Sequence, residues 1–557
     1  MLAHCGFATI PAFIKQSSGA RMTRYKTLVR GVIGSCLCLV SIWVVSECAR
    51  EQQPERGITW LPMCEDLPAG GLDSEVVART QCGIVTVPLD HLNPDLGSLQ
   101  LEITRVTARQ PQAREGAIFT NPGGPGSNGN DTFTVLLASV WKGYIDKPEG
   151  EPYRHLTNAY DLIGITPRGQ SRARDSQLRC QSEELIVTQG DISEDRSPTN
   201  LAALHHNIGV LARGCASQRL APYINTEQTA RDMEFVRIEL NENKLHYFGN
   251  SYGTWLGAWY AGLFPKQVGR MMLDSNMDWT STFQNASLSI APQKERIFNH
   301  FVAEHAANNP QTYRLGSTPK DVREVFLNLL PAVRTALRSD SQYYSSPEHL
   351  MAAQTLSDWL NIMPDADEAE LEMRAQAHRF SPDEEVDHFA RQAFNDVLFI
   401  TRQPVLWNGL APGKLNLSAA DSVRSTVLCN DSPSANAAFW QRKEDIYATK
   451  YPIAGNFFLA RHCAEWKGGH PPAAPFRNVA QADSIVMVQA EFDDQTPRAE
   501  AFNAFARFSN THMVLLKGAY GHGVSFADLS ACVNRYVGEY LAYGRKPERL
   551  TLCEPDD

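Results

Sequence analysis

Short apolar runs alternate with helix-forming stretches along this chain, and this alternation limits the fold more than any other feature. The runs are rich in Ile, Val, Leu, Met and Phe: GAIFT, YDLIGIT, KLHYFGN, GRMMLD, DSIVMVQA and HMVLLKG. Strands separated by helices predict a mostly parallel sheet with helices on both faces, an α/β architecture. Before these runs, residues 83–91 and 99–108 alternate apolar and polar side chains around a turn-rich connection, which predicts a hairpin of two edge strands.

One helical stretch is much longer than the others. Residues 281–478 separate GRMMLD from DSIVMVQA and contain helix-forming segments such as VREVFLNLLPAVRTALR and PDEEVDHFARQAFNDVLFITR. This length exceeds one crossover connection, so we expect a large helical cap inserted before the late strands. The predicted organisation is a signal peptide at 1–48, the N-terminal part of the core at 60–280, the cap at 281–478 and the C-terminal part of the core at 479–557.

The N-terminus has the pattern of an export signal. An uncharged apolar run, residues 31–46, follows four basic residues: Arg21, Arg24, Lys26 and Arg30. Because this run is short for a membrane span, we expect a signal peptide, with a single anchor helix as the alternative. Met22 could be the true start. The signal peptide predicts a periplasmic or secreted location. Cys48 follows a sequence that only loosely resembles a bacterial lipobox, and a lipid anchor at Cys48 is the one membrane association considered.

Composition and charge exclude several classes of protein. Apolar residues make up 43% of the chain and charged residues 20%, as in ordinary globular proteins. The net charge is −10 and no basic cluster occurs beyond the N-terminus, so nucleic acid is not an expected partner. Neither a CxxC pair nor HExxH occurs, so we expect no cysteine zinc site, no zincin site and no cofactor.

The cysteines agree with export. Of twelve cysteines, four lie in or beside the signal: Cys5, Cys36, Cys38 and Cys48. The remaining even number suits a disulfide framework in an oxidising compartment. Sequence alone does not fix the connectivity, but pairing nearest neighbours closes only local loops and predicts four bonds: Cys64–Cys82, Cys180–Cys215, Cys429–Cys463 and Cys532–Cys553.

The candidate nucleophile is Ser251 in GNSYG, a match to GxSxG. The run KLHYF before it predicts a strand and TWLGAWYAGLF after it predicts a helix, which is the strand–turn–helix context of a nucleophile elbow. Glycines on both sides of the serine let the strand and the helix approach closely. The alternative is an ordinary turn in which Ser251 caps the helix.

A serine hydroxyl needs a base and an orienting carboxylate, which follow the serine in the order acid, then histidine, in α/β-hydrolases. His522 lies between two glycines directly after the last apolar run, whereas other histidines, such as His205 and His206, lie in helix-forming sequence. Three acidic residues come at the end of DSIVMVQA: Glu491, Asp493 and Asp494. From residue type and position alone, each of the three could be the acid or a solvated loop carboxylate.

The loop NPGGPG follows an early apolar run, where the fold places one oxyanion donor. The second donor is the backbone N–H of the residue after the nucleophile, here Tyr252. Glycines expose their amides without obstruction by side chains. Phosphate binding is the competing interpretation of this loop, but the loop lacks the GK[ST] ending of a P-loop.

With these motifs, the chain resembles the tripeptidyl aminopeptidase group of α/β-hydrolase serine peptidases, relatives of proline iminopeptidases. The resemblance runs from about Cys64 to Cys553 and includes CGIVTVPLDH, NPGGPG, PRGQS, GNSYGTWLG, MMLDSNMD, CND, CAEW, DDQTP and GHG. It implies an α/β-hydrolase fold and these site residues: Ser251 as nucleophile, Asp493 as acid, His522 as base, Gly124 and Tyr252 as oxyanion donors. It also supports pairing of the tail cysteines 532 and 553.

The sequence departs from this group at three positions. Thr166 stands where relatives usually carry an aspartate before PRG, and Glu491 and Asp494 replace the usual small and proline residues around the acid. The implied function is an exported serine exopeptidase that takes peptide substrates with free N-termini. The alternatives are an esterase or other small-molecule hydrolase, and a catalytically silent binding protein.

Overall fold

The computed structural model describes residues 57–64, 67, 72–127, 132–339, 344–403, 410–455, 458–469 and 474–556. The chain divides into two units, Met1–Gln53 and Pro54–Asp557, and the description below concerns the second. The predicted signal, the start at Met22 and the lipid anchor at Cys48 lie outside the described residues and stay predictions. In the part of the chain that is described, no helix combines the length and the apolar character that a membrane crossing requires.

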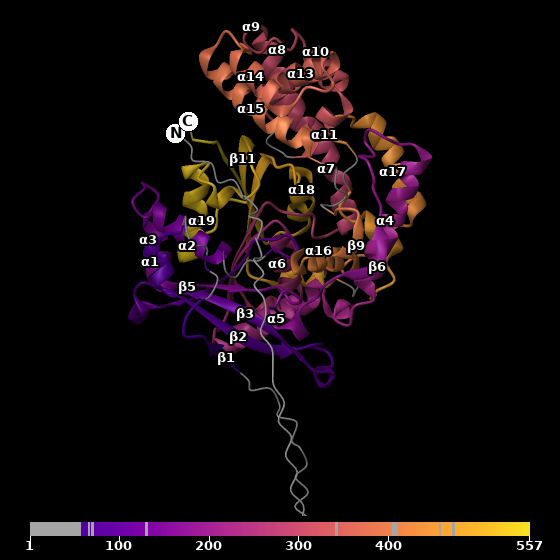
Figure 1. The fold of residues 1–557 in the computed structure, drawn as a ribbon. Helices are drawn as coiled ribbons and strands as arrows, with labels where there is room; N and C mark the ends of the chain where they lie inside the picture. Colours follow the sequence, from indigo (N-terminus) through magenta and orange to yellow (C-terminus); the bar gives the residue numbers. More distant parts are fainter. Residues whose placement is uncertain are drawn as a thin grey trace, which may run out of the picture. The chain divides into compact units, whose positions relative to one another are not determined.

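A mostly parallel sheet of ten strands forms the core, as the alternating pattern predicts (Figure 1). The strand order is β1-β2-β3-β5-β4-β7-β8-β10-β11-β12, with antiparallel pairing from β1 to β5 and parallel pairing from β5 to β12. The bounds are β1 Ile58–Trp60, β2 Thr80–Pro88, β3 Ser98–Val106, β4 Gly116–Asn121, β5 Tyr160–Ile165, β7 Leu245–Asn250, β8 Val268–Asp274, β10 Ile485–Phe492, β11 Thr511–Tyr520 and β12 Leu550–Cys553.

The predicted hairpin is present as β2 and β3, but the prediction that both are edge strands is wrong. β1 pairs with the outer side of β2, and β5 pairs with β3. The three-residue strand β1 is too short to give a sequence pattern, and the pairing of β3 with β5 joins segments that are separated by β4 in the chain. Alternation of polar and apolar residues therefore identified the two strands and their pairing with each other, but not the strands on their outer sides.

Helices cover both faces of the sheet, because successive side chains of a strand point to opposite faces. In β8, Met271 and Leu273 pack with helices α5 and α6, whereas Met272 packs with α2, α3 and α19. The bounds of the helices in the sheet-bearing part are α1 Ser74–Ala78, α2 Thr134–Tyr144, α3 Glu151–Ala159, α4 Pro198–Ala216, α5 Thr226–Glu239, α6 Tyr252–Leu263, α18 Arg498–Arg507 and α19 Ala531–Tyr543.

Helices dominate the segment between β8 and β10. They are α7 Phe283–Ile297, α8 His305–Asn308, α9 Pro310–Tyr313, α10 Pro319–Asn328, α11 Pro331–Ser339, α13 Pro347–Ile362, α14 Glu368–Ala377, α15 Glu384–Arg402, α16 Ala419–Asn430 and α17 Ala437–Lys450. Helices α8 to α15 gather into one group with an apolar core of its own, which includes Phe326, Leu356 and Phe394 (Figure 1). The boundaries 281–478 of a cap domain stay a prediction.

A second segment joins this helical part. Strand β6 (Gln181–Ile186) pairs antiparallel with β9 (Gly413–Asn416) in a separate two-stranded sheet. Val210 and Leu211 of α4 pack in the same apolar cluster as Leu415 and Leu417. The sequence predicts that residues 181–216, which precede Ser251, belong to the core at 60–280, yet they contact the inserted segment.

Four disulfides are present: Cys64–Cys82, Cys180–Cys215, Cys429–Cys463 and Cys532–Cys553. These are the pairs that nearest-neighbour pairing predicts. The bond Cys532–Cys553 ties the start of α19 to β12. Each bond therefore closes a local loop rather than joining distant segments.

Candidate active site

Ser251 lies in the turn between β7 and α6, in a backbone conformation that L-residues rarely adopt. Its φ is 57° and its ψ is −123°, which is unfavourable for a residue with a side chain and is typical of strained functional sites. The Ser251 N–H donates to the carbonyl of Asp274 at 2.9 Å, so β8 holds the turn. Ser251 occupies the position before α6, but its side chain makes no capping hydrogen bond. The capping alternative is therefore not supported.

The glycine-rich loop after β4 lies directly against this turn. A Cβ atom on Gly123, whose φ is +103°, would lie 2.7 Å from the Ser251 Cβ and 2.9 Å from the Tyr252 nitrogen. The Gly123 N–H already donates to the side chain of Asn121 at 3.0 Å. Within the described residues, neither the Gly124 N–H nor the Tyr252 N–H has an acceptor. These two amides remain available, as an oxyanion hole requires.

His522 and Asp493 form a direct pair. The His522 Nδ1 atom lies 3.0 Å from both carboxylate oxygens of Asp493, which is fully buried. Asp493 Oδ1 also accepts the N–H groups of Gln495 at 2.9 Å and Thr496 at 2.8 Å, and its Oδ2 accepts the Thr496 hydroxyl at 2.8 Å. These donors fix the carboxylate, which in turn orients the imidazole so that Nε2 is left for proton transfer.

Three carboxylates raise the pKa of His522. Burial by itself lowers the pKa of the imidazole, but the Asp493 carboxylate, with smaller contributions from Asp494 and Asp274, outweighs burial and raises the pKa above its ordinary value. The site therefore stabilises an imidazolium, the form that appears when a base has taken a proton.

The loop that carries His522 is held by β8. Buried Asp274 accepts the Ser525 N–H at 2.7 Å, the Ser525 hydroxyl at 2.6 Å and the Val524 N–H at 3.2 Å. The Ser275 hydroxyl accepts the Gly523 N–H at 2.7 Å. Burial raises the pKa of Asp274. The sequence analysis did not identify the roles of Asp274, Ser275 or Thr496. The only features that point to them are an Asp-Ser pair at a strand end and a threonine three residues after Asp493.

The other two acidic residues of the strand end point elsewhere. Glu491 forms ion pairs with Arg296 at 2.7 Å and Arg498 at 2.8 Å. Asp494 accepts hydroxyl hydrogen bonds from two tyrosines rather than contacting the imidazole. Of the three candidates that sequence left open, only Asp493 hydrogen-bonds to His522.

Parallel strand order brings these residues to one edge of the sheet. Ser251 follows β7, Asp274 ends β8, Asp493 follows β10 and His522 follows β11, and these strands are neighbours in that order. The carboxyl ends of parallel strands lie at the same edge, where α/β proteins place their sites. The arrangement places a serine with positive φ, a histidine paired with a buried carboxylate and two backbone amides at one edge of the sheet. These are the kinds of group that acyl transfer requires.

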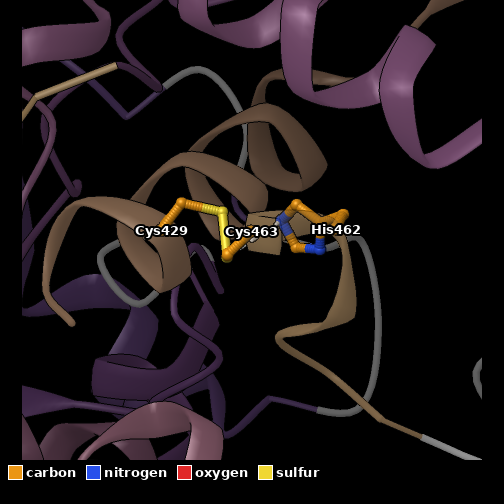
Figure 2. A group of neighbouring side chains, drawn as sticks. All are labelled: Cys429, His462 and Cys463. Atoms are coloured by element: carbon orange, nitrogen blue, oxygen red, sulfur yellow. Dashed lines mark hydrogen bonds between the residues drawn. A yellow bond between two sulfur atoms is a disulfide. The ribbon is translucent and has the colours of Figure 1, made fainter. Parts of the chain in front are cut away.

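A buried group of Cys429, His462 and Cys463 has metal-binding atoms within 4.8 Å of one another (Figure 2). The two sulfurs are bonded to each other, and His462 Nε2 lies 3.0 Å from the Ser425 carbonyl oxygen. Zinc binds thiolate, and a disulfide offers none. These side chains therefore fit a structural disulfide rather than a metal centre.

Two protein families match the parts of the chain that hold these residues. The family described as alpha/beta hydrolase fold matches residues 169–362, which include Ser251, and the family described as TAP-like protein matches residues 451–553, which include Asp493 and His522. With the observed sheet, these matches identify an α/β-hydrolase fold.

Three named relatives match between 56% and 90% of the chain. It is 27% identical to the tripeptidyl aminopeptidase of Streptomyces lividans over 514 residues, 90% of this chain and 87% of that protein. It is 26% identical to the serine protease Hip1 of Mycobacterium tuberculosis over 325 residues, 56% of this chain and 58% of that protein. It is 25% identical to carboxylesterase B of Mycobacterium tuberculosis over 511 residues, 87% of this chain and 88% of that protein.

Solved structures of low similarity also align. The proline iminopeptidase of Mycobacterium smegmatis is 12% identical, with a TM-score of 0.32 and coverage of 82% of this chain and 97% of that chain. Esterase E22 is 10% identical, with a TM-score of 0.32 and coverage of 83% of this chain and 100% of that chain.

Proposed function

We propose that this serine hydrolase of the α/β-hydrolase fold, a relative of the tripeptidyl aminopeptidases, is an exported exopeptidase that releases short peptides or single residues from free N-termini. The observation that carries the proposal is the buried Asp493 carboxylate, 3.0 Å from His522 Nδ1, at the same sheet edge as a serine with positive φ. This combination supports a nucleophile after β7, an acid after β10 and a base after β11, all at the same edge of the sheet.

The proposed reaction is acyl transfer in two stages. The Ser251 Oγ attacks the substrate carbonyl carbon while His522 Nε2 takes the hydroxyl proton, and the Gly124 and Tyr252 amides donate to the oxyanion. When the tetrahedral intermediate collapses, the imidazolium gives its proton to the leaving amine and an ester to Ser251 remains. Water then attacks this ester while His522 takes its proton. The imidazolium gives that proton to the departing Ser251 oxygen, which restores the hydroxyl and releases the acid product.

His522 and Asp493 favour these proton transfers. The attack requires neutral imidazole, and the Asp493 carboxylate stabilises the imidazolium that forms. Because the pKa of His522 is raised, activity should fall on the acid side as the imidazole becomes protonated before substrate binds.

Two kinds of observation support peptides and export. Two relatives are named as peptidases, a tripeptidyl aminopeptidase and a serine protease, which favours peptide substrates for this protein. Four disulfides suit an oxidising compartment, in agreement with the signal predicted at 1–48. If the helices between β8 and β10 form the predicted cap, the cap would exclude long substrates and admit short ones.

Ester hydrolysis is the second candidate, because one relative over most of the chain is named carboxylesterase B. The residues of the site do not distinguish an amide from an ester, since both pass through the same acyl-enzyme.

The test is an assay of the purified protein on aminoacyl and tripeptidyl anilides, their N-acylated forms and simple p-nitrophenyl esters. We expect cleavage of unblocked anilides and none by Ser251→Ala, which should also fail to react with a fluorophosphonate probe. Cleavage of esters alone would refute the peptidase, and equal cleavage of N-acylated anilides would refute the requirement for a free N-terminus. Unchanged turnover by Ser251→Ala would refute the nucleophile itself.

A further inference from the structure

Asp494 is a buried carboxylate next to the candidate acid that the proposed reaction does not use. Its exposed fraction is 3%, and it makes no hydrogen bond to His522. Instead it accepts hydrogen bonds from the hydroxyls of Tyr344 at 2.7 Å and Tyr520 at 3.2 Å. Burying a carboxylate costs free energy unless it has hydrogen-bond partners, and here both partners are tyrosine hydroxyls.

The two tyrosines come from different parts of the fold. Tyr520 ends β11, two residues before His522, so its hydroxyl anchors the loop that carries the base. Tyr344 lies between α11 and α13, in the helical segment inserted between β8 and β10. Its ring packs in an apolar cluster with Phe492, the residue before Asp493. One carboxylate thus joins the acid turn, the histidine loop and the inserted segment.

We propose that Asp494 is a positioning residue for His522, which it serves by holding the histidine loop through Tyr520, by docking the inserted segment through Tyr344, and by adding negative charge beside the imidazole. This inference rests on the proposed function, because it concerns how the base of that reaction is held.

The charged groups around Asp494 and His522 are consistent with an electrostatic effect of Asp494 on the imidazole. Asp493, Asp494 and Asp274 are the carboxylates that raise the pKa of His522. Within the described residues, no lysine or arginine forms an ion pair with Asp494, so its charge is not neutralised by a direct contact. The Lys294 Nζ lies 5.0 Å from the centre of the Tyr344 ring, and Arg296 and Arg498 pair with Glu491.

The test is the pH dependence of the rate at which a fluorophosphonate probe labels Ser251, which needs no knowledge of the substrate. Asp494→Asn keeps the shape and one acceptor but removes the charge. We expect the acid limb of its profile to move to lower pH, so that about one pH unit below the wild-type midpoint its rate relative to its plateau is at least about twofold that of the wild type.

Glu491→Gln is the matched control, because it removes a carboxylate on the same strand end that pairs with arginines. Its profile should match the wild type. Tyr344→Phe leaves the charge of Asp494 but removes its shorter hydrogen bond, so its acid limb should move less than that of Asp494→Asn, while its KM for an anilide rises with little change in the melting temperature.

The outcomes separate the two proposals. An Asp494→Asn profile that coincides with the wild type, or a Glu491→Gln profile that shifts as far, overturns the role of Asp494 while leaving Ser251 as nucleophile. Absence of labelling at Ser251 in the wild-type protein overturns the proposed function instead. If Asp494→Asn does not fold, a Tyr344→Phe variant with wild-type KM and wild-type pH profile overturns the inference.

Discussion

Replacement of Asp493 by asparagine tests the candidate site most sharply. Two backbone N–H groups, from Gln495 and Thr496, donate to Oδ1, so the amide oxygen of asparagine takes that position. The amide nitrogen then replaces Oδ2, 3.0 Å from His522 Nδ1. A donor at this place favours the imidazole tautomer that has its proton on Nε2, and that tautomer cannot accept the proton of Ser251.

The expected loss follows from two effects, the wrong tautomer and the missing negative charge opposite the imidazolium. In a Ser-His-Asp triad the equivalent change costs about 10⁴-fold in kcat, which corresponds to about 5.5 kcal/mol of activation free energy. The fold should survive, because asparagine has the same shape and the Thr496 hydroxyl, 2.8 Å from Oδ2, can rotate to accept instead of donate.

The assay is the rate of fluorophosphonate labelling together with turnover of an unblocked anilide. Asp493→Asn should lose about 10³- to 10⁴-fold in both, with a melting temperature near that of the wild type. Glu491→Gln and Asp494→Asn should keep plateau rates within about tenfold. Near-normal rates for Asp493→Asn, or a greater loss for either control, would refute the assignment of the acid.

Three further predictions concern other parts of the structure. Gly123→Ala should slow labelling of Ser251 about 10²-fold, because a Cβ would lie 2.7 Å from the Ser251 Cβ; labelling kinetics at unchanged secondary structure check this. Burial raises the pKa of Asp431 to about 7, so the folded state binds more protons than the unfolded state between about pH 4 and 7, and stability falls by about 4 kcal/mol as pH rises through that window. Asp431→Asn should therefore flatten the decline in melting temperature from pH 5 to 8, and an unchanged slope would contradict the assignment. Removal of the Cys429–Cys463 bond by double serine substitution should lower the free energy of unfolding by about 2 to 4 kcal/mol in urea titrations.

Local features of the sequence predicted the elements and most of the candidate site. Strands β7, β8, β10 and β11 are predominantly apolar, because both faces of a parallel sheet are covered. Such runs can be recognised without any knowledge of contacts. The glycines around Ser251 mark the sharp turn for the same local reason. Disulfides between neighbouring cysteines were predictable because each closes a local loop.

Resemblance to known peptidases supplied what local pattern left open. Glu491, Asp493 and Asp494 stand within four residues of one another and have the same charge, so periodicity cannot rank them. The resemblance singled out Asp493. In the structure this residue is a fully buried carboxylate with two backbone donors and a histidine partner.

The sequence by itself determined the α/β alternation, the elbow at Ser251 and the order of serine, acid and histidine, because these depend on periodicity and on the chemistry of adjacent residues. Tertiary structure alone decided that β6 pairs with β9, that Asp274 holds the histidine loop and that Asp494 joins Tyr344 to Tyr520. Each of these contacts joins residues far apart in the chain. A local sequence pattern does not specify which distant segments become neighbours when the sheet assembles.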